Sequence, residues 1–209
     1  MASKTDLRRL AITFSLLLLI VATLIPNPVA AASALPDLKT FISSVENGNA
    51  DSLSGVYVDG AFALSVVQQP PSNAGYVSTI ANTVTQFGLA TQYGNVGLLA
   101  HNYLSGQFFL QLIPGERVVL IYGDGSIQTF RITHIYRYQA TEPNSTRSNF
   151  IDLNTGEKLT ADQLFAKVYT GAHHVTFQTC IANNGNSSWG RLFVIAEPAT
   201  NQASPPHWN

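Results

Sequence analysis

Short β-forming segments, separated by turn residues at nearly regular spacing, are the feature that most limits what this chain can fold into. From residue 56 onward, runs rich in Val, Ile, Thr, Phe and Tyr are broken by Gly, Pro and Asn roughly every ten residues. The predicted strands are residues 57–58, 62–67, 83–89, 96–101, 107–112, 117–122, 127–138, 175–182 and 192–196. The pattern therefore predicts a mainly β domain.

Two turns in this pattern predict how neighbouring strands are connected. Asp59-Gly60 stands between two apolar runs, and Gly123-Asp124-Gly125 joins two more. Glycine adopts the positive φ that tight hairpins require. Both pairs of flanking strands should therefore be antiparallel.

Two short helices are also predicted. Residues 38–45 place apolar side chains at i, i+3, i+4 and i+7 directly after Asp37, which is a good N-cap residue. The second helix falls within an insertion at residues 139–174, where Thr160 and Gln163 have the spacing of a capping box. Long insertions on β scaffolds often shape a binding site.

The ends of the chain differ in character from the β-rich part. Residues 1–34 combine basic side chains, an apolar run over residues 10–25 and an Ala-x-Ala site, which predicts a signal peptide or an N-terminal membrane segment. The other predicted parts are an N-terminal helix and linker (35–55), the main domain (56–198) and a disordered polar tail (199–209). The predicted location is extracytoplasmic, either secreted or anchored to the cell envelope.

Composition excludes several classes of function. Only 11% of the residues are charged, against roughly 25% in an ordinary soluble domain, and the formal net charge is −1. No basic surface for nucleic acid is expected. The single cysteine, Cys180, excludes an internal disulfide and any Cys-rich metal site, and no cofactor or metal is predicted.

Cys180 is the candidate nucleophile. In a strand, Thr176, Gln178 and Cys180 share one face, and Cys180 stands near the strand end before a turn-rich segment. A thiol placed there can reach a groove. The alternative is a small buried apolar residue, which is the usual role of a free cysteine.

A reactive thiol needs a base or a cation nearby. Among the five histidines, His101 is the best candidate because it ends an apolar run; the others are His134, His173, His174 and His207, and none has a metal-binding spacing. Arg191 precedes the last apolar run. Its guanidinium is either a solvated charge at a strand end or a donor to an oxyanion.

The order of these residues resembles the sortases, which are cysteine transpeptidases of bacterial surfaces. The resemblance rests on His101, then Thr176-Phe177-Gln178-Thr179-Cys180, then Arg191 before an apolar strand. Residues 113–116 look like a Lys-Pro-Gly-Asp segment of that family. Papain-like proteases fit less well, since they place the cysteine before the histidine.

The resemblance implies a closed β-barrel of about eight strands with one or two short peripheral helices. It implies that Cys180 attacks a C-terminal sorting motif, that His101 acts as general acid and base, and that Arg191 stabilises the oxyanion; Thr179 would help to hold the substrate. The implied partners are exported proteins that carry a sorting signal and an amine acceptor on the cell wall or on a protein. A sortase-fold peptidase that releases its product to water, and a noncatalytic envelope binding module, remain as alternatives.

Overall fold

The computed structural model describes residues 35–145 and 147–199. The predicted signal peptide or membrane segment, residues 1–34, lies outside the described residues, as do residues 200–209 of the predicted tail. In the described part of the chain, no helix has the length and hydrophobicity needed to cross a membrane.

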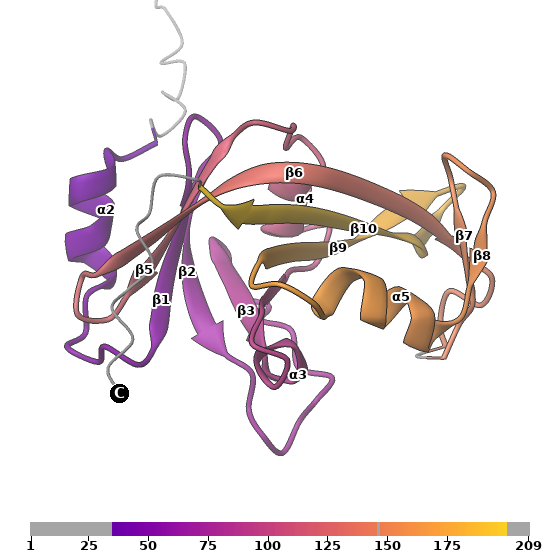
Figure 1. The fold of residues 1–209 in the computed structure, drawn as a ribbon, viewed down its shortest axis with the longest axis horizontal. Coiled ribbons are helices and arrows are strands. Elements are labelled where there is room, and N and C mark those ends of the chain that lie inside the picture. Colours follow the sequence, from indigo (N-terminus) through magenta and orange to yellow (C-terminus); the bar gives the residue numbers. More distant parts are fainter. Residues whose placement is uncertain (1–34, 146, 200–209) are drawn as a thin grey trace, which may run out of the picture. The chain divides into compact units, whose positions relative to one another are not determined.

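The described residues form ten strands and four short helices (Figure 1). The strands are β1 (Leu53–Val58), β2 (Phe62–Gln68), β3 (Thr83–Phe87), β4 (Val96–Leu99), β5 (Arg117–Tyr122), β6 (Ile127–Ala140), β7 (Phe150–Asp152), β8 (Lys158–Leu159), β9 (Val175–Asn183) and β10 (Asn186–Pro198). The helices are α2 (Leu38–Val45), α3 (Gly88–Thr91), α4 (Gly106–Phe109) and α5 (Ala161–Tyr169).

Eight of these strands form a closed barrel, which confirms the predicted fold class. The order is β10-β9-β4-β3-β2-β1-β5-β6, and pairing of β10 with β6 closes the ring, while β7 and β8 extend the sheet beyond β6. Only β2–β3 and β4–β9 pair in parallel among the pairings within the described residues. Figure 1 shows β6 and β10 running side by side, with α5 alongside the barrel.

The strands bury apolar side chains on both faces of the barrel wall. The interior is filled by alternate residues such as Val194 and Phe177, which are fully buried. A second cluster lies outside the wall, where Phe193 and Ile195 of β10 pack with Leu164 and other side chains of α5. The wall is therefore covered by α5 along part of its outer face.

The predicted turns and helix starts are confirmed. Gly60 (φ +72°) and Gly125 (φ +82°) occupy the turns of the antiparallel β1–β2 and β5–β6 hairpins. The Asp37 side chain accepts a hydrogen bond from the Thr40 backbone N–H (3.0 Å) at the start of α2. Thr160 and Gln163 form the reciprocal capping box of α5.

Other predicted boundaries were wrong. Residues 107–112, predicted as a strand, overlap α4 and the turn after it; Phe109 is buried in the core while Leu110 is exposed. The predicted strand 83–89 stops at Phe87 and continues as α3. The strand expected to reach residue 101 ends at Leu99, and the two short strands β7 and β8 within residues 139–174 were not predicted.

Candidate active site

The thiol of Cys180 lies on the outer face of the barrel wall. Alternation along β9 sends Val175 and Phe177 into the core, and therefore sends Thr176, Gln178 and Cys180 outward. Thr176 is fully buried, and its hydroxyl donates to the carbonyl of Val168 at the end of α5. Gln178 and Cys180 are only half-buried. The exposure of the outward-facing side chains of β9 therefore increases from Thr176 to Cys180, and Cys180 lies outside the hydrophobic core.

Arg191 stands directly opposite Cys180 on the neighbouring strand. Cys180 and Arg191 are register partners in the antiparallel β9–β10 ladder. Leu192 and Val194 belong to the core, so Arg191 projects from the same outer face as Cys180. Directly opposed residues in such a ladder have Cβ atoms about 4.5–5.5 Å apart. The strand pairing thus places the Cβ atoms of Cys180 and Arg191 side by side on this face.

The guanidinium of Arg191 is held by backbone carbonyl groups. Its Nη1 donates to the carbonyl oxygens of Ser188 (2.8 Å) and Gly190 (2.9 Å) in the β9–β10 hairpin. Its Nη2 donates to the carbonyl of Pro143 (3.3 Å), in the connection between β6 and β7. A guanidinium has five N–H groups, so the Nε proton and one Nη2 proton have no part in these three bonds.

His101 follows β4, the strand on the other side of β9. The parallel β4–β9 register pairs Leu99 with Gln178, and the Ala100 N–H donates to the Gln178 carbonyl (3.2 Å). Continuing this register puts residue 101 level with residue 180. The side chain of His101 is half-buried. Continued in this way, the register places residues 101, 180 and 191 in one row, with His101 two residues beyond the end of β4.

Thr179 has a different environment from Cys180. It is buried (2% exposed), and its hydroxyl donates to the carbonyl of Ala100 (2.8 Å). This bond joins β9 to the residue before His101. Gly106 packs against the same hydroxyl, because a Cβ on Gly106 would meet Thr179 Oγ1, the His101 carbonyl (2.7 Å) and the Ala100 carbonyl (2.8 Å). This placement gives Thr179 a structural contact with the turn that carries His101.

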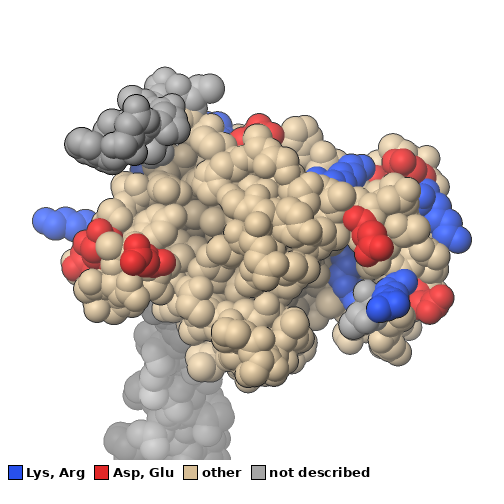
Figure 2. Space-filling view, turned by 60° about the horizontal axis from the view of Figure 1, so that its bottom comes forward, with Lys and Arg blue, Asp and Glu red and all other residues tan. Residues whose placement is uncertain are grey.

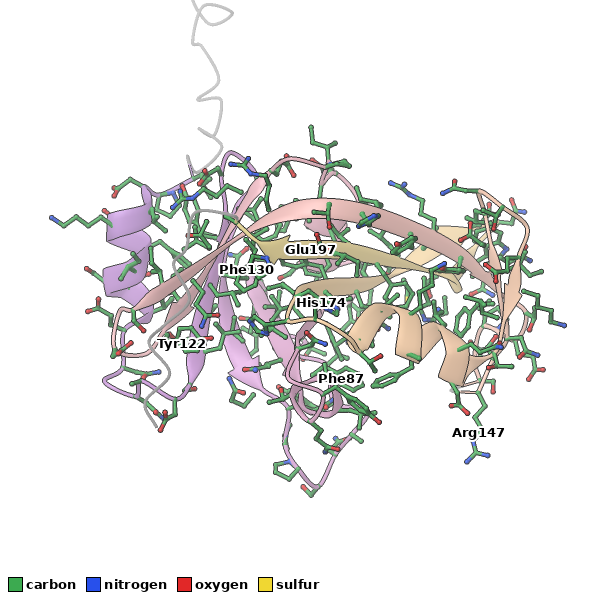
Figure 3. The ribbon with its side chains drawn as sticks, viewed as in Figure 1. Phe87, Tyr122, Phe130, Arg147, His174 and Glu197 are labelled. Atoms are coloured by element: carbon green, nitrogen blue, oxygen red, sulfur yellow. The ribbon has the colours of Figure 1, made fainter. Side chains whose placement is uncertain are left out.

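A cavity of about 330 Å³ lies beside this row, between β9 and α5. We call it the β9–α5 cavity. Gln178 and Arg191 contribute polar groups, and the apolar part of its lining includes Phe87, Leu99, Leu164, Phe165, Val168, Tyr169 and Phe193. Phe87, labelled in Figure 3, packs edge-on against Tyr169 with ring centroids 5.2 Å apart. Gln178 is two residues from Cys180 on the same strand face, whereas Cys180 and His101 themselves do not line the cavity.

Tyr169 fixes the floor of the β9–α5 cavity. Its hydroxyl donates to Oε1 of Gln178. Burial raises the pKa of Tyr169, which keeps the phenol neutral at ordinary pH. With Oε1 occupied, the Gln178 amide presents its NH₂ group for other acceptors. Such donors suit the backbone carbonyls of an extended peptide.

A larger cavity, about 630 Å³, lies on the other flank of α5. His134, His173 and His174 line it together with Lys167 and Glu197, and Figure 3 labels His174 and Glu197. Both ring nitrogens of His174 contact carbonyl oxygens, those of Ala172 (2.7 Å) and Val168 (2.9 Å). None of these histidines belongs to the row with Cys180. Residues 35–145 and 147–199 contain no cluster of three or more His, Cys, Asp or Glu that could hold a metal ion.

The surroundings of the row carry little charge. Residues 60–115 and 168–190, which supply β4, its following turn and β9, contain no Asp, Glu, Lys or Arg. Figure 2 shows a broad uncharged surface between charged groups at either side. This signal was present in the sequence but was not used to predict the site. Arg191 on β10 is consequently the charged residue closest in the strand register to Cys180.

No protein-family model matches the sequence, and no curated protein matches it. The solved structures to which this chain is similar include sortases. Sortase A of Listeria monocytogenes matches with 13% identity over 71% of this chain and 87% of that chain, at a TM-score of 0.44. Sortase C-1 of Actinomyces oris matches with 16% identity over 77% and 81% of the two chains, at a TM-score of 0.47. Sortase C1 of Streptococcus suis gives 12% identity, 80% and 81% coverage, and a TM-score of 0.45.

Proposed function

We propose that this chain is a sortase-type cysteine transpeptidase, with Cys180 as nucleophile, His101 as general acid and base, and Arg191 as oxyanion donor. The observation that carries the proposal is the strand register. It pairs Cys180 with Arg191, and continuing the β4–β9 pairing two residues past Leu99 brings His101 level with Cys180. Cys180 is half-buried, and Arg191 also lines the β9–α5 cavity. The partial exposure of Cys180 supports the proposal, since a purely structural free cysteine is usually fully buried.

The reaction consists of two acyl transfers. The Cys180 thiolate attacks the carbonyl carbon of a peptide bond, and a C–S bond forms. The C–N bond then breaks as His101 gives a proton to the departing amine, which leaves a thioester on Cys180. An acceptor amine attacks the thioester, His101 takes its proton, and a new amide bond replaces the C–S bond. The thiolate is restored.

Arg191 stabilises the negative oxygen that forms in each tetrahedral intermediate. Three of its N–H groups are held by the Ser188, Gly190 and Pro143 carbonyls, and these bonds restrict the motion of the guanidinium. The Nε proton and the second Nη2 proton are the donors left for the oxyanion. Loss of one such donor typically costs about 10²–10³-fold in kcat.

The substrate is a peptide segment bound along β9, with an uncharged side chain in the β9–α5 cavity. In this proposal the donor is an exported protein with a C-terminal sorting signal, and the acceptor is an amine on the cell wall or on another protein. The enzyme acts outside the cytoplasm, and residues 1–34 direct export or anchor it. Thr179 supports the site through its bond to the Ala100 carbonyl.

The test is a peptide-library assay read by mass spectrometry, with and without an added primary amine. The proposal expects products ligated to the amine, and none from Cys180→Ala. Cleaved peptide without ligation, at any amine concentration, would favour the peptidase alternative. If no peptide is processed and Cys180 remains unlabelled by a methanethiosulfonate reagent, the chain is a noncatalytic module.

A further inference from the structure

The turn after β4 places a large exposed aromatic ring against His101. Tyr103 is 66% exposed, yet its ring stacks on the His101 imidazole with centroids 5.1 Å apart and an interplanar angle of 19°. Offset stacking of this kind stabilises a pair of rings beyond the area they bury. One face of the imidazole is therefore covered by the phenol ring.

The turn that carries His101 is fixed by hydrogen bonds within the turn and by a hydrogen bond to the β9–β10 hairpin. The His101 carbonyl accepts hydrogen bonds from the N–H groups of Leu104 (3.0 Å) and Gly106 (3.0 Å). Nδ2 of Asn102 donates to the carbonyl of Ser187 (2.9 Å), in the hairpin that connects Cys180 to Arg191. The main chain of His101 is thus held, and its ring orientation depends on the two side-chain torsions alone.

We propose that Tyr103 is a positioning residue for His101. Stacking holds the plane of the imidazole parallel to the phenol ring and restricts its rotation, so the ring presents its edge at one fixed orientation in the row with Cys180. Tyr103 acts through its ring face and needs no hydroxyl group for this role. The inference rests on the proposed function, because it assumes that His101 acts on the thiol.

Alkylation of Cys180 by iodoacetamide measures this role without a substrate. The rate reports the thiolate fraction, which a neighbouring imidazole raises. In the full chain between pH 5 and 9, His101→Ala should slow alkylation at neutral pH and remove the histidine-dependent step from the pH profile. Tyr103→Ala should give a two- to tenfold decrease, roughly the population shift that loss of an aromatic stack produces. Tyr103→Phe should restore the wild-type rate.

Two further measurements separate positioning from a general loss of structure. Tyr93 is another exposed tyrosine (52% exposed), located after α3, so Tyr93→Ala is the matched control and should alkylate at the wild-type rate. Carbethoxylation of His101 by diethylpyrocarbonate, followed by peptide mass mapping, should accelerate in Tyr103→Ala because one ring face is uncovered. It should stay at the wild-type rate in Tyr103→Phe.

The outcomes distinguish this inference from the proposed function. If His101→Ala slows alkylation but Tyr103→Ala does not, Tyr103 has no positioning role and the proposed function stands. If Tyr103→Phe is as slow as Tyr103→Ala, the hydroxyl and not the ring stack is responsible, and the inference is wrong. If His101→Ala alkylates like the wild type, His101 does not act on the thiol, and both proposals fall.

Discussion

Replacing Arg191 with lysine separates its structural role from its proposed catalytic role. The guanidinium donates to three carbonyl oxygens, those of Ser188, Gly190 and Pro143, and keeps two further N–H groups. A lysine ammonium has three N–H groups on one nitrogen. It cannot hold all three carbonyls and also donate to an oxyanion, so the variant loses the donor that matters in the transition state.

The expected size of the effect follows from this count. Loss of one oxyanion donor lowers kcat by about 10²–10³-fold, while KM changes little because the donor acts mainly in the transition state. The cost to folding is small, since Arg191 and two of its carbonyl partners, Ser188 and Pro143, are half-buried. Arg137 is exposed on the neighbouring strand β6, and Arg137→Lys is the matched control.

The assay is steady-state transfer of a processed peptide to an amine, together with urea unfolding and the alkylation rate of Cys180. Arg191→Lys should lose kcat, while KM, stability and alkylation stay near those of the wild type and of Arg137→Lys. A kcat within threefold of the wild type would refute the oxyanion role. An alkylation rate that falls in parallel with kcat would show that Arg191 acts on the thiolate instead.

Two further predictions concern stability. Thr179→Val removes the buried hydroxyl that donates to the Ala100 carbonyl, so urea unfolding should show a loss of stability of about 1–3 kcal/mol. Thr179→Ser keeps a hydroxyl and should retain most of the stability. Equal stability of Thr179→Val and the wild type would contradict the role of this bond. Burial raises the pKa of Tyr169 in the folded state, so the folded chain keeps a proton that the unfolded chain releases above about pH 10. The free energy of unfolding should therefore fall as pH rises above 10, with a slope from this group approaching about 1.4 kcal/mol per pH unit. Tyr169→Phe should show a shallower slope. Identical slopes in the variant and the wild type would contradict the raised pKa of Tyr169.

Features set by neighbouring residues were predictable from the sequence. The capping box at Thr160 and Gln163 and the glycine turns at Gly60 and Gly125 depend on contacts within a few residues, and all are present in the structure. The segment 107–112 was misassigned for the same local reason. Its short apolar run is compatible with a strand or a helix, and the burial of Phe109 in the core depends on residues far away in the sequence.

Features set by strand pairing were less accessible. The order of His101, Cys180 and Arg191 along the chain suggested a site, but the row depends on parallel pairing of β4 with β9, whose partners are 79 positions apart in sequence. The hydrogen bond from Arg191 to the Pro143 carbonyl and the β9–α5 cavity could not be predicted, because each is formed by segments that are far apart in the sequence. Tyr103 and His101 are only two positions apart in the sequence, but their stacking depends on the conformation of the turn between them, which was not predicted.

The central claim is that Cys180 becomes acylated by a peptide during turnover. The direct measurement is intact-protein mass spectrometry of the full chain, mixed with a processed peptide and quenched in acid before an amine is added, followed by mapping of the modified residue. The account predicts a mass increase equal to the acyl fragment, located on Cys180 and removed by hydroxylamine, with none in Cys180→Ala. Processing of the peptide by Cys180→Ala at the wild-type rate, or an adduct on another residue, would contradict it.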